Sequence, residues 1–463
     1  MNYDIIVLGS GPGGYVAAIR ASQLGMKVAV VEKAELGGIC LNWGCIPTKA
    51  LLKSAQVFNY AKHAADYGVI LNEEPKADLA SMVKRSRDVA NNMSKGIQFL
   101  FKKNNIDVIE GFGKLMPGKK IEVTNSASEL TVYEAKHIVI ATGARSKELP
   151  SLKQDGVKII GYRQALTLNE QPKRMVVVGS GAIGSEFAYF YNSIGTQVTL
   201  IEFLPNIIPI EDEEVSKQLE RSFKKAGIKV MTNSSVESVD IIDNICKVHV
   251  NTKKGLEEIE ADIVLSAVGV ETNITGIGLE SCGIQFEGGK ILVDEYYKTN
   301  IEGYYAIGDV VKGPALAHVA SHEGIICVEK IAGHKPEPLD YRNIPSCTYT
   351  NPEVASVGYT EKAAIEAGYE IKVGKFPFSA SGKATASGAK DGFVKVIFDA
   401  KYGEWLGAHL IGDNVTEMIA EVVLGRKLET TGKEVIDAVH PHPTMSEAIM
   451  EAVAAAFGEV IHL

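Results

Sequence analysis

Residues 37–49 read Gly37-Gly-Ile-Cys-Leu-Asn-Trp-Gly-Cys-Ile-Pro-Thr-Lys49, so four residues separate the two cysteines Cys40 and Cys45. Pro47 lacks an N–H group and tolerates only the first turn of a helix, and apolar residues at helical spacing follow it. We therefore expect a helix to begin near Pro47. Cys45 would then lie at the positive end of that helix, where a thiolate is stabilised.

The two cysteines can form a disulfide only if the chain between them is not a regular helix. Five residues of regular helix place two Cα atoms farther apart than the roughly 4.4–6.8 Å that a disulfide allows. We therefore expect Cys40 on a bent or non-helical approach, which Gly44 and the pair Gly37-Gly38 permit. Such a strained, partly exposed pair can cycle between dithiol and disulfide. Two unrelated buried thiols, or half of a zinc site, remain alternatives at this point.

The composition is that of a globular protein and excludes several classes of partner. The chain has 463 residues, enough for about three domains, with 46% apolar and 23% charged residues. Its formal net charge of −9, without a basic block, disfavours nucleic acid and anionic membranes as partners. No apolar run approaches the roughly 20 residues that span a bilayer. The N-terminus shows no export signal, so we expect a cytoplasmic protein.

A dinucleotide-binding fingerprint opens the chain. The apolar run Asp4–Leu8 predicts a buried parallel strand, and a helical pattern follows the glycines after it. Those glycines have the G-x-G-x-x-G spacing: Gly9, Gly11 and Gly14. The next predicted strand ends on Glu32, eighteen residues after Gly14. In this fingerprint the glycines let backbone N–H groups approach a pyrophosphate at a helix N-terminus, and the carboxylate binds ribose hydroxyls.

The same fingerprint occurs a second time. A strand at Arg174–Val178 leads into three glycines of the same spacing: Gly179, Gly181 and Gly184. Glu202 follows Gly184 by eighteen residues, the same offset as in the first copy. An internal repeat is stronger evidence than either copy alone, and it predicts two dinucleotide-binding domains and two nucleotides.

The cysteine pair indicates which nucleotide belongs to which copy. It follows Glu32 directly, and a flavin exchanges electrons readily with a disulfide whereas a nicotinamide does not. We therefore expect FAD in the first copy and a nicotinamide in the second. Glu202 favours NAD over NADP, because a carboxylate repels a 2′-phosphate and residues 203–207 offer no arginine.

Three later segments are candidates for further nucleotide contacts. A strand at 137–141 runs into Thr142-Gly143, and a similar strand at 262–266 precedes Gly269. Both could be ordinary strand ends. Asp309, after a short apolar strand, could bind the ribityl chain of a flavin or could instead cap the following helix.

The C-terminal part has a different pattern. Apolar runs at 393–398 and 405–411 predict an antiparallel sheet, and helical patterns cover 416–424 and 447–457. A proline-rich loop carries His440 and His442 before Glu447. Glu447 could fix the tautomer of His442, which could remove the proton of a substrate thiol. Two loop histidines without any chemical role are the alternative.

These motifs together resemble the flavin-dependent pyridine nucleotide–disulfide oxidoreductases over the whole chain, and most closely the dihydrolipoamide dehydrogenase (E3) branch. The resemblance implies an α/β fold with two Rossmann-like domains and a C-terminal α+β dimerisation domain. Its implied divisions are FAD-binding 1–147, NAD-binding 148–272, central 273–345 and interface 346–463. It also implies an obligate homodimer, in which the histidine loop of one subunit completes the disulfide site of the other.

The resemblance implies a reaction as well. Dihydrolipoamide on a separate lipoyl carrier would bind near Cys40, and His442, oriented by Glu447, would take its thiol proton. The substrate thiolate would attack Cys40, and Cys45 would become the thiolate beside the flavin, from which a hydride passes to NAD. The implied partners are the acyltransferase (E2) core of a 2-oxo acid dehydrogenase complex or the H-protein of a glycine cleavage complex.

Carried over position by position, the resemblance also names cofactor-binding residues. Lys49 would lie near the reactive nitrogen of the flavin, with Glu186 as its partner. The FAD contacts would be Gly9, Gly11, Gly14, Glu32, Gly113, Thr142, Gly143, Asp309, Ala315, Ala317 and His318. The NAD contacts would be Gly179, Gly181, Gly184, Glu202, Val236 and Gly269. No metal site is expected.

Two positions depart from the family pattern. Trp43 occupies a variable position beside the disulfide, and Gly269 is followed by Val-Glu-Thr-Asn where many relatives carry an arginine. Within the family, glutathione-type reductases usually carry arginines after the second fingerprint, and mercuric reductases carry a C-terminal cysteine pair; this chain has neither. Outside it, a zinc-binding or nucleotide-sensing protein with Cys40, Cys45, His440 and His442 as ligands would leave both fingerprints unexplained.

Overall fold

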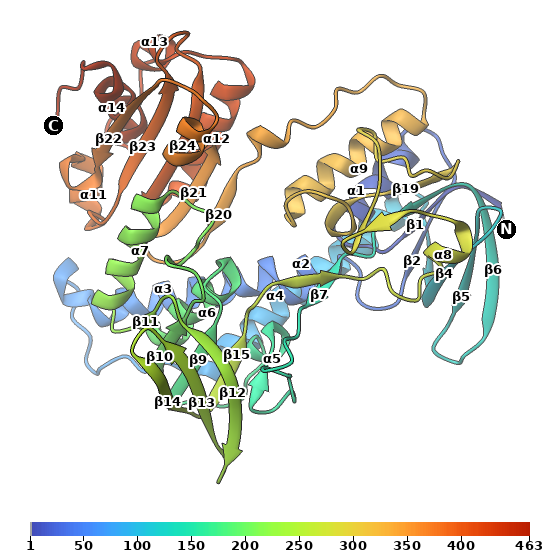
Figure 1. The fold of residues 1–463 in the computed structure, drawn as a ribbon, viewed down its shortest axis with the longest axis horizontal. Helices are drawn as coiled ribbons and strands as arrows, with labels where there is room; N and C mark the ends of the chain where they lie inside the picture. Colours follow the sequence, from blue (N-terminus) through green and yellow to red (C-terminus); the bar gives the residue numbers. More distant parts are fainter. Residues whose placement is uncertain (1) are drawn as a thin grey trace. The chain divides into compact units, whose positions relative to one another are not determined.

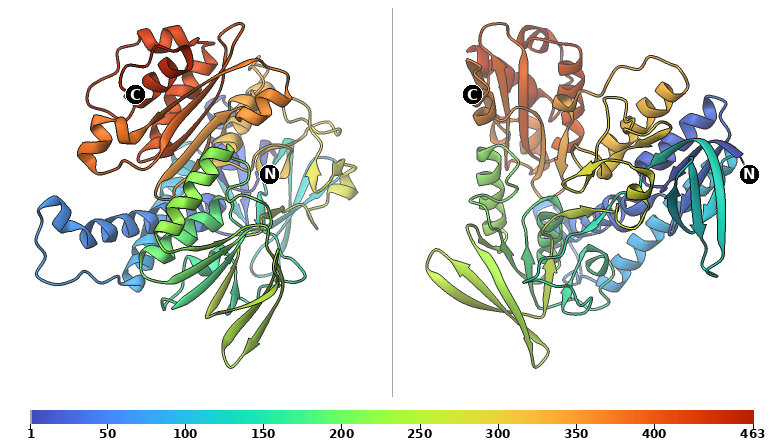
Figure 2. Two further views of the ribbon diagram at one scale, coloured as in Figure 1. Left: turned by 60° about the vertical axis from the view of Figure 1, so that its left-hand side comes forward. Right: turned by 45° about the vertical axis from the view of Figure 1, so that its right-hand side comes forward.

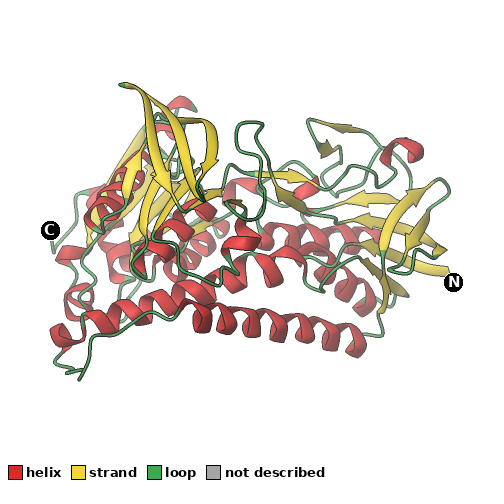
Figure 3. Ribbon diagram, turned by 90° about the horizontal axis from the view of Figure 1, so that it is seen from below, coloured by secondary structure: helices red, strands yellow, loops and turns green. Residues whose placement is uncertain are grey.

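The structure contains many helices and strands, which the ribbon coloured by secondary structure shows (Figure 3). The computed structural model describes residues 2–463. It divides the chain into two units. The first unit contains Met1–Leu51, Ala80–Lys147 and Gly269–Leu339, and the second contains Leu52–Leu79, Glu148–Val268 and Asp340–Leu463. The domain boundaries after residues 147, 272 and 345 stay predictions.

The first unit is built on a seven-stranded sheet with the order β3-β2-β1-β6-β5-β4, in which β19 also pairs with β6 (Figure 1). Its strands are β1 (Asn2–Leu8), β2 (Val28–Glu32), β3 (Asp107–Glu110), β4 (Phe112–Met116), β5 (Lys120–Thr124), β6 (Leu130–Ile140) and β19 (Tyr304–Ala306). Strands β1, β2, β3, β6 and β19 are parallel, whereas β4 and β5 form an antiparallel meander with β6. The continuous apolar runs in β1 and β2 are buried, as expected for parallel strands that helices cover.

Helices of the first unit pack closely against this sheet and each other. They are α1 (Pro12–Gln23), α2 (Gly38–Trp43), α8 (Leu279–Cys282), α9 (Ala317–Ile331) and nearly all of α4 (Leu79–Lys103). Two short two-stranded sheets accompany them: β7 (Ala144–Ser146) with β16 (Val270–Thr272), and β17 (Phe286–Glu287) with β18 (Lys290–Ile291). Helices α1 and α9 approach so closely that a Cβ atom on Gly324 would lie 2.8 Å from the carbonyl oxygen of Gly13. Helix α3 (Cys45–Lys62) begins in the first unit and ends in the second.

The second unit contains the repeat of the dinucleotide fold. A parallel sheet has the order β11-β10-β9-β15-β8, and an antiparallel sheet has the order β12-β13-β14. The strands are β8 (Ile159–Ile160), β9 (Arg174–Val178), β10 (Gln197–Ile201), β11 (Lys229–Met231), β12 (Ser235–Ile242), β13 (Ile245–Thr252), β14 (Gly255–Ala261) and β15 (Ile263–Ser266). The helices of this part are α5 (Tyr162–Ala165), α6 (Ala182–Ser193) and α7 (Glu213–Lys225).

The C-terminal residues of the second unit form an antiparallel sheet with the order β20-β21-β24-β23-β22. Its strands are β20 (Ser346–Thr348), β21 (Glu353–Gly358), β22 (Ile371–Pro377), β23 (Phe393–Asp399) and β24 (Trp405–Gly412). Helices α10 (Glu361–Glu366), α11 (Gly382–Ser387), α12 (Val415–Lys427), α13 (Gly432–Asp437) and α14 (Glu447–Phe457) accompany it. Helix α14 packs on β22 and β23, and α12 packs on β21 and β24 (Figure 2). The α/β fold with a C-terminal α+β part is therefore confirmed.

A buried ion cluster joins α7 to this C-terminal sheet within the second unit. The side chain of Lys395 on β23 is 2% exposed and contacts Asp212 at 3.1 Å, Glu214 at 2.9 Å and Glu361 at 2.6 Å. Asp212 is also the N-cap of α7, where its carboxylate accepts the N–H of Glu214. Lys375 forms a further ion pair with Glu214. A buried lysine of this kind needs such partners, because an unpaired charge away from water is costly.

Candidate active site

The cysteine pair lies in a turn between two helices. Cys40 is in the short helix α2, Gly44 ends that helix, and Cys45 is the first residue of α3. The bent approach that we predicted is therefore confirmed: Cys40 lies in one helical turn, and the chain changes direction at Gly44 before Cys45. The Cys40 thiol is hydrogen-bonded to Cys45, and both are free thiols.

The chemistry of the two thiols differs. The hydrogen bond with Cys45 and burial hold the pKa of Cys40 well above the usual thiol range, and the positive charge of Lys49 partly offsets that rise. Cys45 lies at the N-terminus of α3, where the helix dipole stabilises negative charge. The arrangement suits a dithiol that forms a disulfide and is reduced again.

This turn packs directly on the first glycine loop. Gly38 has a φ of +62°, and a Cβ atom there would lie 2.6 Å from the Cα atom of Gly11. The backbone N–H of Gly37 donates to Ser10 Oγ at 3.2 Å. The cysteines are therefore adjacent to the loop that the sequence assigns to a dinucleotide.

Helix α4 braces the turn, a role that the sequence analysis missed. Three consecutive residues donate to backbone carbonyls of the turn and of α3: Arg87 to Asn42, Ser86 Oγ to Pro47 at 2.9 Å and Arg85 to Ala50 at 2.8 Å. The Arg87 guanidinium also lies 4.3 Å from the ring centroid of Trp43, which accounts for the tryptophan at this variable position. The amphipathic pattern of residues 79–103 could have predicted the helix, but not its contacts.

The two fingerprints have the same local geometry. Ser10 donates to Glu32 Oε2 from its N–H at 2.9 Å and from Oγ at 2.7 Å. Ser180 donates to Glu202 Oε2 from its N–H at 2.9 Å and from Oγ at 2.6 Å. In both copies the loop serine thus fixes the carboxylate at the carboxyl end of the second strand, where open α/β sheets bind ligands.

Both glycine loops fit a pyrophosphate. The first and last glycines are in backbone contact: a Cβ on Gly14 would lie 2.0 Å from the Gly9 oxygen, and one on Gly184 would lie 1.9 Å from the Gly179 oxygen. The middle glycines have no atom within 4 Å of such a Cβ. These glycines, Gly11 and Gly181, are the N-caps of α1 and α6, and neither helix has a side-chain cap. Both helix N-termini thus lack a side-chain cap and have open space beside the capping glycine, which suits the binding of an anion.

The other predicted flavin contacts lie in the first unit. Thr142 and Gly143 follow β6 and bond to Asn273. Burial raises the pKa of Asp309, which lies in the short 3-10 turn Gly308–Val310. The N-cap of α9 is instead Leu316, so the alternative that Asp309 caps this helix is wrong. Ala315, Ala317 and His318 lie at the N-terminus of α9, and Gly113 packs in β4 beside Leu8 and Val31.

The predicted nucleotide contacts also include Glu186, Val236 and Gly269. Glu186 on α6 is 4% exposed and accepts the backbone N–H of Tyr349 at 3.0 Å. It belongs to the second unit and Lys49 to the first, so their pairing stays a prediction. Val236 lies on β12, and Gly269 has a φ of +107°. Glu271, two residues after Gly269, forms an ion pair with Arg145 at 2.8 Å.

The histidine loop has the predicted pair. His442 Nδ1 lies 2.9 Å from Glu447 Oε1, and the backbone N–H of Thr444 donates to Glu447 Oε2 at 2.7 Å. Burial alone would raise the pKa of Glu447, but these hydrogen bonds and the neighbouring histidines hold it below its usual value. The ionised carboxylate therefore holds the proton on Nδ1 and leaves Nε2 of the imidazole, whose side chain is 78% exposed, able to accept a proton.

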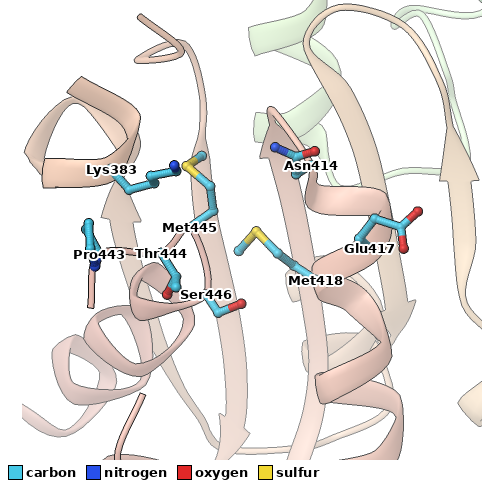
Figure 4. A pocket seen from close by; sticks show the side chains of 8 residues that line it. All are labelled: Lys383, Asn414, Glu417, Met418, Pro443, Thr444, Met445 and Ser446. Atoms are coloured by element: carbon cyan, nitrogen blue, oxygen red, sulfur yellow. The ribbon is translucent and has the colours of Figure 1, made fainter. Parts of the chain in front are cut away.

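A groove of about 440 Å³ lies beside this loop (Figure 4). Residues 443–446 of the loop line one side, with Lys383, and Asn414, Glu417 and Met418 line the other. Among residues 2–463, no group of three or more His, Cys, Asp or Glu side chains could hold a metal ion, and no helix combines the length and apolarity needed to cross a bilayer.

Comparisons with known proteins agree with this geometry. The family described as pyridine nucleotide-disulphide oxidoreductase matches residues 3–324, and the dimerisation domain of the same family matches residues 344–453. A Rhizobium etli protein named dihydrolipoyl dehydrogenase is 49% identical over 477 residues, covering 100% of this chain and 99% of that protein. A Bacillus subtilis protein of the same name is 43% identical over 470 residues, covering 99% of each.

A solved structure is also similar. LpdA from Mycobacterium tuberculosis superposes with a TM-score of 0.90 at 28% identity, covering 97% of this chain and 98% of that one. The cysteine turn, the two glycine loops and these full-length matches lead to one conclusion: the chain belongs to the pyridine nucleotide-disulphide oxidoreductase family.

Proposed function

We propose that this chain is a dihydrolipoyl dehydrogenase, which oxidises dihydrolipoamide on a lipoyl carrier and reduces NAD⁺ to NADH. The observation that carries the proposal is the position of the Cys40–Cys45 turn, directly on the first of two dinucleotide loops. Relatives with the name dihydrolipoyl dehydrogenase, matched over their full length, support the substrate. Bound FAD would accept the electron pair from the dithiol and supply the hydride that reduces NAD⁺.

The residues of the chain would exchange one disulfide for another. His442 of the partner subunit, oriented by Glu447, would remove a proton from one substrate thiol. The thiolate would attack Cys40 and break its bond to Cys45, which would leave as a thiolate. The second substrate thiol would then attack the mixed disulfide, forming lipoamide and releasing Cys40 as a thiol. The position of Cys45 at a helix N-terminus supports this order, because a leaving thiolate is stabilised there.

The nicotinamide would bind at the second loop, through Gly179, Gly181, Gly184 and Glu202. Glu202 has its carboxylate fixed by Ser180 and by the N–H of Leu204. A fixed negative charge there disfavours the 2′-phosphate of NADP. Lys49 and Glu186 would lie on the flavin side, with Gly113, Thr142, Gly143 and Asp309 as further FAD contacts. Val236 and Gly269 would contact NAD.

The assembly belongs to the proposal too. The match to a dimerisation domain supports a homodimer. The partner complex would be the E2 core of a 2-oxo acid dehydrogenase or the H-protein of a glycine cleavage system, and the compartment the cytoplasm. Pull-down with each lipoyl carrier and fractionation of the source cells would test these two points.

The reaction is tested by NADH formation from dihydrolipoamide and NAD⁺, followed at 340 nm, in wild type, Cys40→Ser and Cys45→Ser. Turnover in the wild type and its loss in both variants is the expected result. Cys282→Ser is the matched control, since this cysteine lies on α8 and outside the turn. A yellow, flavin-bound wild type without turnover would refute the lipoamide assignment, and glutathione disulfide with NADPH would be tried next.

A further inference from the structure

The loop that carries His442 contains a second histidine in a very different environment. The His440 side chain is 7% exposed, against 78% for His442. Its Nε2 lies 2.7 Å from Glu421 Oε1 on α12, and its Nδ1 lies 3.0 Å from the carbonyl oxygen of Ala438. Both ring nitrogens therefore have a close partner, and the ring is enclosed between the loop and the helix.

The chemistry of those partners sets the charge of the ring. A carbonyl oxygen and a carboxylate oxygen only accept hydrogen bonds, so both ring nitrogens must donate. A neutral imidazole has one N–H group and cannot do this, whereas an imidazolium has two. The geometry thus requires His440 to be a cation, paired with the Glu421 anion. Consistently, the hydrogen bond with Glu421 raises the pKa of His440 above its usual value.

The His440 cation faces the pair His442 and Glu447 as well as its own partner, Glu421. The charged groups around it come from two helices, Glu421 from α12 and Glu447 from α14, and Glu447 is also bonded to His442. The positive charge of His440 is one of the influences that lower the pKa of Glu447. The loop is thus tied to α12 by His440 and to α14 by Glu447. A further bond, from Thr444 Oγ1 to the Pro441 carbonyl at 2.8 Å, stiffens the segment between them.

We infer that Glu421 and His440 are positioning residues, an ion pair between a buried imidazole and a partly exposed carboxylate that holds the loop on α12 and helps to keep Glu447 ionised so that it orients His442. The inference rests on the proposed function, in which His442 is the base. Glu421 and His440 touch neither substrate nor cofactor in this scheme. They act through Glu447, which must carry its charge to hold the proton on His442 Nδ1 and leave Nε2 free.

The first test compares Glu421→Gln with wild type in the NADH-forming assay across pH. The amide keeps the shape of the side chain and removes the charge that makes the imidazolium favourable. We expect kcat to fall about tenfold, a part of the roughly 10²–10⁴-fold that a general base contributes, with KM for NAD⁺ unchanged. We also expect the acid limb of the rate profile to move to higher pH, because Glu447 loses a nearby cation.

Two further variants separate charge from packing. Glu421→Asp keeps a carboxylate on α12 and should restore most of kcat and the wild-type acid limb. Glu429→Gln removes a different, exposed carboxylate just after the C-terminus of the same helix and should behave as wild type. If Glu421→Gln matches the wild type in kcat and in its pH profile, the inference is refuted while the proposed function stands.

A readout without turnover uses protein labelled with [¹³Cε1]histidine. The chain has 10 histidines, and the His440 signal is identified by its absence in His440→Gln. We expect His440 to stay protonated to a higher pH than an exposed histidine, and both this titration and the His442 signal to change in Glu421→Gln. A His440 signal that titrates like an exposed histidine refutes the ion pair, whether or not the wild type oxidises dihydrolipoamide. If the His440 and His442 signals behave as expected but the wild type does not oxidise dihydrolipoamide, the ion pair stands and only the proposed function is refuted.

Discussion

Replacement of Lys395 by methionine should destabilise the second unit strongly. Methionine has a similar length and no charge, so the variant keeps the packing of the stem and removes every bond of the ammonium group. Those bonds join Lys395 to Asp212, Glu214 and Glu361. The loss therefore isolates what the charge contributes at this position.

The magnitude depends on which carboxylate is left without a partner. Glu214 and Glu361 are 44% and 39% exposed, so water can replace the lysine and their pairs contribute little. Asp212 is 4% exposed and keeps only backbone donors, the N–H of Glu214 at 3.0 Å and that of Glu361 at 3.4 Å. Removal of one partner from a buried pair costs about 3–5 kcal/mol. Because Asp212 keeps its backbone hydrogen bonds, we expect the free energy of unfolding to fall by about 3 kcal/mol, the lower end of that range.

Urea unfolding of the flavin-bound protein, followed by tryptophan fluorescence, measures the change. Trp405 lies 3% exposed on β24, next to the strand that carries Lys395, and reports on this sheet. With a slope of about 3 kcal/mol per molar urea, the midpoint should fall by about 1 M. Lys390→Met, at an exposed lysine of the same part of the chain, should leave the midpoint unchanged.

A second substitution tests the reasoning. Asp212→Asn added to Lys395→Met removes the stranded charge and keeps a good N-cap for α7, so it should recover at least half of the lost stability. A midpoint of Lys395→Met within about 0.3 M of wild type would refute the argument. So would a double variant less stable than the single one.

The ion cluster also predicts a pH dependence. Burial by itself raises the pKa of Glu214, but its bonds to Lys375 and Lys395 lower it below the usual value. A carboxyl group whose pKa is lowered in the folded protein stabilises the fold at pH values above about 4.3, the pKa of a glutamate in the unfolded chain. This stabilisation is lost as the pH falls through the lower pKa that the group has in the folded protein. Wild type should therefore lose stability below about pH 4.3 more steeply than Lys395→Met, which urea midpoints from pH 6 to 3 would show.

Four further substitutions test the candidate site. Arg87→Ala removes the donor to Asn42 and the cation over Trp43, so turnover with dihydrolipoamide should fall about tenfold at unchanged flavin content; equal turnover would contradict the bracing role. Gly181→Ala points a methyl group into open space, so it should abolish NADH binding, measured by fluorescence, without changing the melting temperature. Gly184→Ala should instead unfold the loop. Glu202→Gln should shift the ratio of kcat/KM for NAD⁺ and NADP⁺ toward NADP⁺ about tenfold, and an unchanged ratio would contradict its role.

Much of the fold was predictable because its signals are local. Buried parallel strands are continuous apolar runs, and the glycine spacing of a dinucleotide loop reflects a backbone that must touch itself, as Gly14 does with Gly9. The equal offset of the two acidic residues identified the repeat before any contact was known. The pair His442 and Glu447 was predictable for the same reason, since both lie within one short loop.

Contacts between segments that are distant in the sequence decided the features that could not be predicted. Cys40 lies in a helical turn because α4, starting some forty residues later, donates to the carbonyls of that turn. Lys395 is an apparently ordinary lysine in an apolar strand, and only the N-termini of α7 and α10 enclose it with three carboxylates. Likewise His440 becomes a cation because α12 brings Glu421 to it. The sequence by itself determined most of the strands, the glycine loops and the candidate reacting groups, whose signals are short-range. The tertiary structure alone decided their charge states and supports, because these depend on burial and on partners that no local pattern records.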